Sequence, residues 1–546
     1  MKKIIKKIAV CSTAVAISVS STYIAKAEIP KGYWKYQESF LNAANAKEDN
    51  EIIALGKEIM NVFKDKPMDS DKAGILYSTY EAMYPAYERQ ENYEMAIAVL
   101  KAQIPYGEYL GYNDGVKIAK ARIKKIDPMT EVYAVTSNTQ SVPYYGMKNE
   151  PKNGTYYGRV FSESGLLPTE TETAVSFYVE CLQDGIWEYD YLINPYANGE
   201  KVVQICLNMP NENDSLKAVL QDSSNSYLQQ TMEYLNSLNC PVLLRIGGEM
   251  NVWQNLAEPS LYKQAYGKIA NMARSKAQNV ALVFSPNDIS NWNANIDDYY
   301  PGDSYVDWVG VSLYTNKYRN LQTMEQGEDF EEMYYGNGLY ANPIAKLRDI
   351  VDRYGDRKPI IISECGIGNS VYNKGSNLTA FAKDKLNVLY TYANMVYPQV
   401  KAMIYFDVCF DNQPNAYIYS ISNNSALMEQ YKATVNSNSS FIKKMGATPL
   451  AYVKAGEYSD NRETIELYTY SILPAQTSMA VDYYVDGEAV CATQTQMPYK
   501  CNISSSSISS GAHELKVTVK SGNGYSKVKT YSLKKTDDGK ITVAEK

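Results

Sequence analysis

The chain has 546 residues, a formal net charge of −7 and one histidine, His513. This length predicts several domains, and an acidic chain without a basic stripe excludes nucleic acid as the main partner. A single histidine excludes Ser-His-Asp and Cys-His catalysis, and a histidine-based metal site, in the rest of the chain. Acid–base chemistry must therefore use carboxylates, tyrosines or lysines, and no cofactor is expected.

Residues 1–27 have the pattern of a secretory signal peptide. Lysines precede an apolar stretch that ends in Ala25-Lys26-Ala27, and we expect cleavage after Ala27. Loss of five lysines and no acid leaves a charge of −12. No later segment offers about twenty uninterrupted apolar residues, so no membrane span is expected. The sequence predicts a secreted, extracellular protein and leaves cell-surface association open.

Residues 28–130 are predicted to form an α-helical domain. The segments ESFLNAANAKEDNEIIALGKEIMNVF and ENYEMAIAVLKAQI carry apolar residues at three- and four-residue spacing. Their alternation with short polar turns resembles tetratricopeptide-like helical pairs, although the repeat is irregular. Two roles stay open for this domain: contact with a protein or the cell envelope, and packing alone.

Residues 131–446 alternate β-rich apolar runs with helical stretches. Eight strand candidates occur in chain order: YYGRVFS, SFYVECL, KVVQICLNM, PVLLRIGGEMN, VALVFSPND, DWVGVSLY, KPIIISECG and KAMIYFDV. Eight strand–helix units over about 300 residues are typical of an α/β fold, the (β/α)8 barrel. The alternative is a doubly wound open sheet, which is disfavoured because no glycine-rich phosphate loop follows the early strands.

Residues 450–546 are predicted to be all-β. Short alternating strands with Gly, Asn and Ser turns resemble an immunoglobulin-like module of secreted enzymes, with His513 near a strand start. Cys491 and Cys501 could form a disulfide across a hairpin in an oxidising compartment. Either a plain spacer or a weak carbohydrate or envelope contact would suit this domain.

The polar residues that end the barrel strands are the candidate site, because barrel sites lie at the carboxyl ends of the strands. Two glutamates, Glu249 and Glu364, follow buried apolar runs in the fourth and seventh strands, where a charge would not otherwise be tolerated. Strands four and seven lie on opposite sides of a barrel mouth, so the two carboxyls can face a ligand between them. The other strand-end candidates are Asn251, Asn287, Tyr314 and Asp407.

Two facing carboxyls match the chemistry of glycosidic bond cleavage. One carboxylic acid protonates the leaving oxygen, and one carboxylate attacks the anomeric carbon when the two groups are about 5–5.5 Å apart. Arg245 and Tyr314 are candidates for keeping the nucleophile ionised and oriented, and Trp253 could stack on a sugar.

At these residues the chain resembles glycoside hydrolase family 26. The resemblance covers residues 155–430 and is carried by four blocks in order: RIGGEMN at 245–251, VALVFSPND at 280–288, YYPGDSYVDWVGVSLY at 299–314 and KPIIISECG at 358–366. It implies Glu249 as acid/base and Glu364 as nucleophile, with Arg245 and Tyr314 as supports. It also implies a retaining enzyme on a β-1,4-linked polysaccharide, mannan in most of the family and xylan or mixed-linkage glucan in some members; endo action is expected by likeness to the mannanases, and the sequence leaves exo action open.

The chain departs from the family pattern at three places, and one of them is Val252, which replaces the final glycine of the motif around Glu249. Gly248 stands where the family motif R-x-x-H-E-M-N-G has its histidine, so we interpret Gly248 as a missing side chain that leaves space beside the sugar. Strand eight lacks the family's tryptophan, and Tyr405 or Phe406 is the candidate to replace it. The main hypothesis is a secreted glycosidase; the alternative is a non-catalytic glycan-binding or envelope-scaffold protein on the same barrel.

Overall fold

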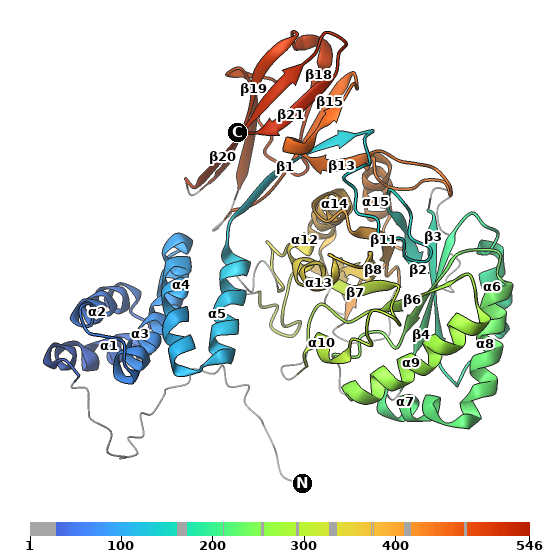
Figure 1. Ribbon diagram of the computed structural model, residues 1–546, viewed down its shortest axis with the longest axis horizontal. Helices are drawn as coiled ribbons and strands as arrows, with labels where there is room; N and C mark the ends of the chain where they lie inside the picture. Colours follow the sequence, from blue (N-terminus) through green and yellow to red (C-terminus); the bar gives the residue numbers. More distant parts are fainter. Residues whose placement is uncertain are drawn as a thin grey trace. The chain divides into compact units, whose positions relative to one another are not determined.

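The structure is a computed structural model of the chain (Figure 1). It describes residues 29–160, 172–210, 212–252, 256–290, 294–326, 336–372, 374, 376–408, 416–473, 478–522 and 524–546. The predicted signal peptide and Trp253 lie outside these residues. The chain divides into two compact units, residues 1–124 and 125–546. None of the described helices is both long enough and apolar enough to cross a membrane.

The first unit is helical, as predicted. Its helices are α1 (Trp34–Ala46), α2 (Asp49–Val62), α3 (Ser70–Arg89), α4 (Tyr93–Leu110) and α5 (Asn113–Ile126). Asp69 and Asn92 each accept a backbone hydrogen bond at the start of α3 and α4, and Gly111, at φ 71°, ends α4. Each of α1 to α3 packs against the next helix along the chain. The tetratricopeptide likeness and a partner for these helices stay predictions.

The second unit contains a closed barrel of eight parallel strands in the order β11-β2-β3-β4-β5-β6-β7-β8. Closure by pairing of β11 with β2 confirms the barrel and excludes the open sheet. All eight predicted strands are present: β2 (Tyr156–Val160), β3 (Ala174–Glu180), β4 (Val202–Asn208), β5 (Val242–Ile246), β6 (Val280–Phe284), β7 (Trp308–Thr315), β8 (Ile360–Ile367) and β11 (Val400–Tyr405).

Helices connect the barrel strands, as a parallel barrel requires. They are α6 (Asp190–Ile193), α7 (Glu212–Leu220), α8 (Asn225–Ser237), α9 (Pro259–Lys276), α10 (Ile296–Tyr299), α12 (Pro343–Lys346), α13 (Arg348–Tyr354), α14 (Thr379–Val396) and α15 (Ser425–Ser437). The barrel interior is filled and partly polar. Gln204 Nε2 on β4 donates to Ser176 Oγ at 2.8 Å and to the Ser363 carbonyl on β8 at 2.9 Å. Strands that are not neighbours are thereby joined across the interior.

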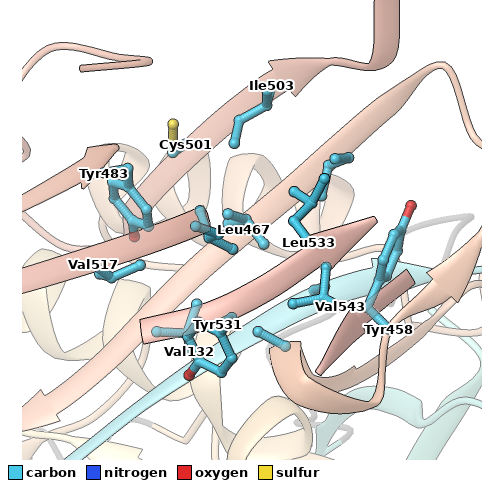
Figure 2. Close-up of a cluster of buried hydrophobic side chains, with 14 of the residues drawn as sticks. Val132, Tyr458, Leu467, Tyr483, Cys501, Ile503, Val517, Tyr531, Leu533 and Val543 are labelled. Carbon is cyan, nitrogen blue, oxygen red and sulfur yellow. The ribbon is translucent and has the colours of Figure 1, made fainter. Parts of the chain in front are cut away.

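A two-sheet β-domain completes the second unit. One sheet has the order β13 (Ala451–Lys454), β1 (Met129–Thr136), β15 (Thr464–Ile472) and β18 (Tyr499–Ser504). The other has the order β14 (Ser459–Asp460), β21 (Ile541–Glu545), β20 (Ser526–Lys535), β19 (Gly511–Ser521), β16 (Met479–Val485) and β17 (Glu488–Ala489). Figure 2 shows the apolar core between the sheets, which includes Val132, Leu467, Val517 and Leu533.

Strand β1 corrects the predicted start of the barrel region at residue 131. Residues 129–136 pair antiparallel with β15 from Met129↔Ile472 to Ala134↔Leu467, and also with β13. The Thr136 hydroxyl and the Ser137 backbone N–H both donate to Asp460, at 2.8 and 2.6 Å. The β-domain therefore takes one strand from before the barrel. Chain order could not indicate this, because the pairing joins segments more than 300 residues apart.

Cys491 and Cys501 are both free thiols in this structure. Cys501 lies in the core of the β-domain, and Cys491 packs against the same cluster. Burial, followed by a hydrogen bond with the Cys491 thiol, raises the pKa of Cys501. The two sulfurs are thus neighbours without a bond, and the disulfide stays a prediction. His513 is the third residue of β19 and pairs with Asp486 at 2.6 Å, away from the barrel strands.

Lys401 on β11 is a buried cation whose ammonium group has no hydrogen-bond partner among the described residues. Burial lowers the pKa of Lys401 from 10.5 to about 8, and attraction by Glu150 offsets only part of this effect. The unfolded chain therefore binds more protons than the folded chain between pH 8 and 10.5. Consequently, this group makes the free energy of unfolding rise with pH across that window.

Lys401→Met should raise the free energy of unfolding at pH 7 by about 1–3 kcal/mol, because a cost of burying the ammonium is removed. The gain should shrink at pH 10. Denaturant unfolding at both pH values measures it. Lys358→Met is the matched control: Lys358 is equally buried, but its ammonium donates to the Asp303 and Val306 carbonyls at 2.9 and 2.7 Å. The control should lose stability; a similar loss in Lys401→Met would contradict the expectation.

Candidate active site

The two glutamates predicted from the sequence lie at the carboxyl ends of their strands. Glu364 is within β8, and Glu249 comes three residues after the end of β5. In the barrel, β6 and β7 separate these two strands. Both side chains therefore belong to the edge of the barrel where barrel sites are built.

Glu364 is held by three hydrogen-bond donors and is 7% exposed. Its Oε2 accepts from Arg245 Nη1 at 2.6 Å and from the Tyr178 hydroxyl at 2.5 Å. Its Oε1 accepts from the Tyr314 hydroxyl. One cation and two phenols thus offset the burial of this carboxylate and fix both of its oxygens.

Arg245 on β5 has its guanidinium fixed on several sides. Besides the ion pair with Glu364, its Nε donates to Ser285 Oγ at 3.2 Å and its Nη2 to Ser312 Oγ at 2.6 Å. Burial is the largest single effect on the pKa of Arg245 and lowers it, but the carboxylate of Glu364 and the smaller contributions of its other neighbours together raise the pKa well above its ordinary value. Arg245 is therefore a permanent cation whose position is set by β6 and β7.

Glu249 has a different environment. Its backbone is in the left-handed region at φ 62°, which is costly for a residue with a side chain and is found at functional sites. Its N–H donates to the Ser285 carbonyl at 2.9 Å, and its Oε1 accepts from Asn287 Nδ2 at 2.9 Å. The side chain is half-buried. A carboxyl with a neutral amide donor suits exchange of a proton.

The two carboxylates act on the same phenols, which places them around one site. Burial, then the charges of Glu364, Tyr178 and Glu249, raise the pKa of Tyr314 well above its ordinary value. Burial raises the pKa of Tyr419 to about 12, with both glutamates adding to the shift. Each phenol therefore stays protonated within electrostatic reach of both glutamates.

Gly248 does not leave space beside a sugar, and this corrects the sequence interpretation. A Cβ at Gly248 would lie 2.4 Å from Arg245 Nε, 2.5 Å from its Cζ and 2.6 Å from its Nη2. Such distances are well inside van der Waals contact. The backbone between Gly247 and Glu249 thus crosses directly against the guanidinium. The place of the missing side chain is occupied by Arg245.

Asn251 and Asn287 brace the loop that carries Glu249. Asn251 is fully buried; its Nδ2 donates to the carbonyls of Asn287 and Ile289 at 3.0 and 3.1 Å, and its Oδ1 accepts from the Asn287 N–H at 2.8 Å. These bonds connect the end of β5 to the end of β6. Asn287 in turn donates to Glu249. Of the two, Asn287 reaches a carboxylate and Asn251 supports it.

Tyr405 and Asp407, which were predicted to contact a ligand, use their polar atoms within the chain. Tyr405 is fully buried, and its hydroxyl donates to the Tyr419 carbonyl at 2.9 Å. Asp407 forms an ion pair with Arg159 at 2.6 Å and accepts from the Ser420 hydroxyl at 2.9 Å and the Ile421 N–H at 2.8 Å. Both residues instead hold the segment that follows β11. Phe406 is 9% exposed and packs edge-on to Tyr178 and Tyr314.

Four residues of the site were not predicted from the sequence: Tyr178, Ser285, Ser312 and Tyr419. Tyr178 is two residues before the end of β3, and this position near the carboxyl end of a strand was the available signal. The serines carry no signal of their own, because small polar residues are common in strands. Tyr419 lies well beyond the last predicted strand, KAMIYFDV, so position at a strand end gave no signal for it.

Glu212 is a third acid close to the pair. It is the first residue of α7, which follows β4, the barrel neighbour of β5, and its φ is 30°. Burial raises the pKa of Glu212 to about 7, and the charges of Glu249 and Glu180 add to the shift. Glu212 therefore changes its charge near neutral pH beside Glu249. No group of three or more His, Cys, Asp or Glu side chains among the described residues could hold a metal ion.

The fold and the site together define a (β/α)8-barrel glycoside hydrolase. Residues 206–388 match the family model "Glycosyl hydrolase family 26", and this segment runs from β4 through both glutamates into α14. Within this segment the chain is similar to glycosyl hydrolase family 26, and this similarity supports a glycoside hydrolase.

Solved structures with the same kind of barrel are distant from the chain. A family 26 β-mannanase from Bacteroides ovatus is 14% identical, covers 54% of this chain and 94% of its own, and has a TM-score of 0.35. A second family 26 protein, GH26C from a Muricauda species, is 16% identical, with coverage of 52% and 86% and a TM-score of 0.38. No curated protein sequence matches the chain. The assignment rests on the family match.

Proposed function

We propose that this protein is a secreted, retaining glycoside hydrolase that cleaves internal linkages of a β-1,4-linked polysaccharide. The observation that carries the proposal is the unequal treatment of the two glutamates. Glu364 is buried and fixed by Arg245 and two phenols, whereas Glu249 is half-buried and accepts from the neutral amide of Asn287. A fixed anion beside a cation suits a nucleophile, and a carboxyl with partial access to solvent suits an acid/base.

In the first step, Glu364 attacks the anomeric carbon while Glu249 gives its proton to the departing glycosidic oxygen. A covalent glycosyl–enzyme forms on Glu364. In the second step, Glu249 takes a proton from water, which attacks the same carbon and frees Glu364 with the configuration retained. Arg245, Tyr178 and Tyr314 hold the nucleophile in position in the free enzyme, since all three donate to its oxygens.

A panel of β-mannan, xylan, mixed-linkage glucan and envelope glycans, assayed for new reducing ends, tests this function. Mannan is the first substrate to try because of the family. Proton NMR of the first product released tests retention, and a Glu364→Gln protein provides the blank. Absence of turnover on every member, with a folded protein, would overturn the proposal.

The panel also separates the alternative of a non-catalytic glycan-binding protein. That reading requires saturable glycan binding without turnover, unchanged in Glu249→Gln and Glu364→Gln. Gly248 and the two accessory domains motivate this alternative, and contact of the glycine with Arg245 accounts for the missing side chain. Secretion rests on the signal peptide pattern, and an envelope or protein partner of the helical unit is a further proposal; fractionation of the producing cells checks both.

Glu212→Gln should move the alkaline limb of the kcat/KM profile to lower pH by about 0.5–1 unit. Above pH 7 Glu212 is charged in the wild type, and its charge opposes loss of the proton that Glu249 must donate. The measurement is kcat/KM from pH 4 to 9. Glu233→Gln, an exposed acid on α8, is the control and should leave the profile in place. An unmoved limb in Glu212→Gln would contradict this coupling.

A further inference from the structure

A small sheet lies over the strand ends that carry the site. Its strands are β9 (Ser370–Val371), β10 (Ser376–Asn377) and β12 (Tyr417–Ile418), and β12 pairs with β9 in the register Tyr417↔Val371 and Ile418↔Ser370. β9 and β10 follow β8, which carries Glu364, and β12 follows β11, its neighbour in the barrel. Tyr419 comes directly after β12, and its position is therefore set by the same edge of the barrel.

The ring of Tyr419 is held against the site. Its centroid is 4.8 Å from that of Tyr314 at an interplanar angle of 57°, and the Tyr419 carbonyl accepts from Tyr405. A Cβ at Gly366 would lie 2.7 Å from Tyr314 Cε1 and 2.8 Å from Tyr419 Cδ1. The glycine two residues after Glu364 therefore lets both rings close on this strand end.

The hydroxyls of the neighbouring tyrosines are used within the chain. Tyr178 and Tyr314 donate to Glu364, and Tyr417 donates to the Tyr318 carbonyl at 2.9 Å. Tyr419 differs, because its hydroxyl oxygen accepts from Asn316 Nδ2 at 3.3 Å while its own proton has no acceptor among the described residues. A phenol O–H without an acceptor in the protein can donate to a ligand.

The Tyr419 hydroxyl lies where it can donate a hydrogen bond to a bound substrate. Burial raises the pKa of Tyr419 to about 12, with the charges of Glu249 and Glu364 adding to the shift, so the phenol stays protonated at neutral pH. A half-buried neutral O–H beside both carboxylates can serve a sugar hydroxyl without changing the charge of the site.

We propose that Tyr419 is a substrate-contacting residue, whose hydroxyl donates a hydrogen bond to one hydroxyl of the sugar unit held between Glu249 and Glu364. The inference rests on the proposed function. It implies a neutral sugar at the cleavage point, since the two buried cations described beside the glutamates are already paired: Arg245 with Glu364, and Lys346 with Asp288 at 3.2 Å. A uronic acid in this position would face two carboxylates, and neither of these two described cations is available to it.

Tyr419→Phe tests the contact, with Tyr417→Phe as the matched control. Both variants lose one phenol hydroxyl from the same sheet, but the Tyr417 hydroxyl has both of its partners on Tyr318. On the glycan that the panel identifies, Tyr419→Phe should lower kcat/KM by about 10- to 100-fold, and Tyr417→Phe by less than about threefold. Equal losses in both variants would show a structural role and overturn the inference.

A substrate series makes the test specific. Aryl β-glycosides of the identified sugar, each lacking one ring hydroxyl, are compared in wild type and Tyr419→Phe. For one member the two proteins should have the same kcat/KM, because the partner of Tyr419 is then absent. A constant ratio across the series would overturn the contact. If the wild-type protein cleaves no glycan of the panel, the proposed function itself is wrong. Failure of the Tyr419 contact is thereby distinguished from failure of the proposed function.

Discussion

Glu364→Gln should reduce turnover on the best glycan of the panel by a factor on the order of 10⁴ or more. The amide has almost the same shape as the carboxylate but cannot form the glycosyl–enzyme. It also places an NH2 group or a neutral oxygen opposite Arg245 and two phenols that all donate hydrogen. Loss of turnover should therefore appear in kcat as well as in kcat/KM.

Glu249→Ala provides the contrast that assigns the two roles. An aryl glycoside with an acidic phenol as leaving group needs no proton donor for the first step, so it should restore that step in Glu249→Ala and not in Glu364→Gln. Added azide should replace water in Glu249→Ala and release a β-glycosyl azide. Thermal unfolding of both variants confirms the fold. Equal rescue of the two variants, or rescue of Glu364→Gln alone, would reverse or reject the assignment.

The barrel could be predicted because its signals are local. Each of the eight barrel strands is an apolar run of five to eight residues flanked by polar segments. The helices between them have the helical spacing of apolar residues. Glu249 and Glu364 could be found for the same reason, since a charge next to a buried run is exceptional. Strand β1 could not be placed, because its partners β13 and β15 are distant in sequence and any apolar strand fits the same pattern.

The details of the site depend on contacts that sequence distance hides. Tyr405 and Asp407 are in strand-end positions, yet the segment 416–422 folds back and uses their polar atoms. That same segment brings Tyr419 to Tyr314. Position along a strand can indicate which residues approach the barrel mouth. It cannot indicate which of them are covered by a returning loop.

Gly248 shows the same limit most clearly. Compared with a family motif, a glycine in place of a histidine indicates a loss, and space is the natural expectation. In the structure the three nearest atoms to a Cβ here all belong to Arg245. An arginine on a flexible surface could move away, but this guanidinium is fixed by Ser285, Ser312 and Glu364. The glycine is thus the partner of an arginine packed under the loop.

Gly248→Ala should therefore lower kcat/KM by about 10²- to 10³-fold, and Gly248→His, which restores the histidine of the family motif, should lower it at least as far. The added Cβ must displace either the guanidinium that holds Glu364 or the turn that holds Glu249, and each shift moves a reacting carboxyl. Gly267→Ala on α9 is the matched control, since its Cβ would meet only Tyr305 at 3.8 Å; it should keep wild-type kcat/KM. Steady-state kinetics and thermal unfolding of the three variants give the answer. Higher activity in Gly248→His would mean that Arg245 can move aside and that the glycine reduces function. Inactivity with an intact fold would mean that the position of Arg245, and with it the site, requires the glycine.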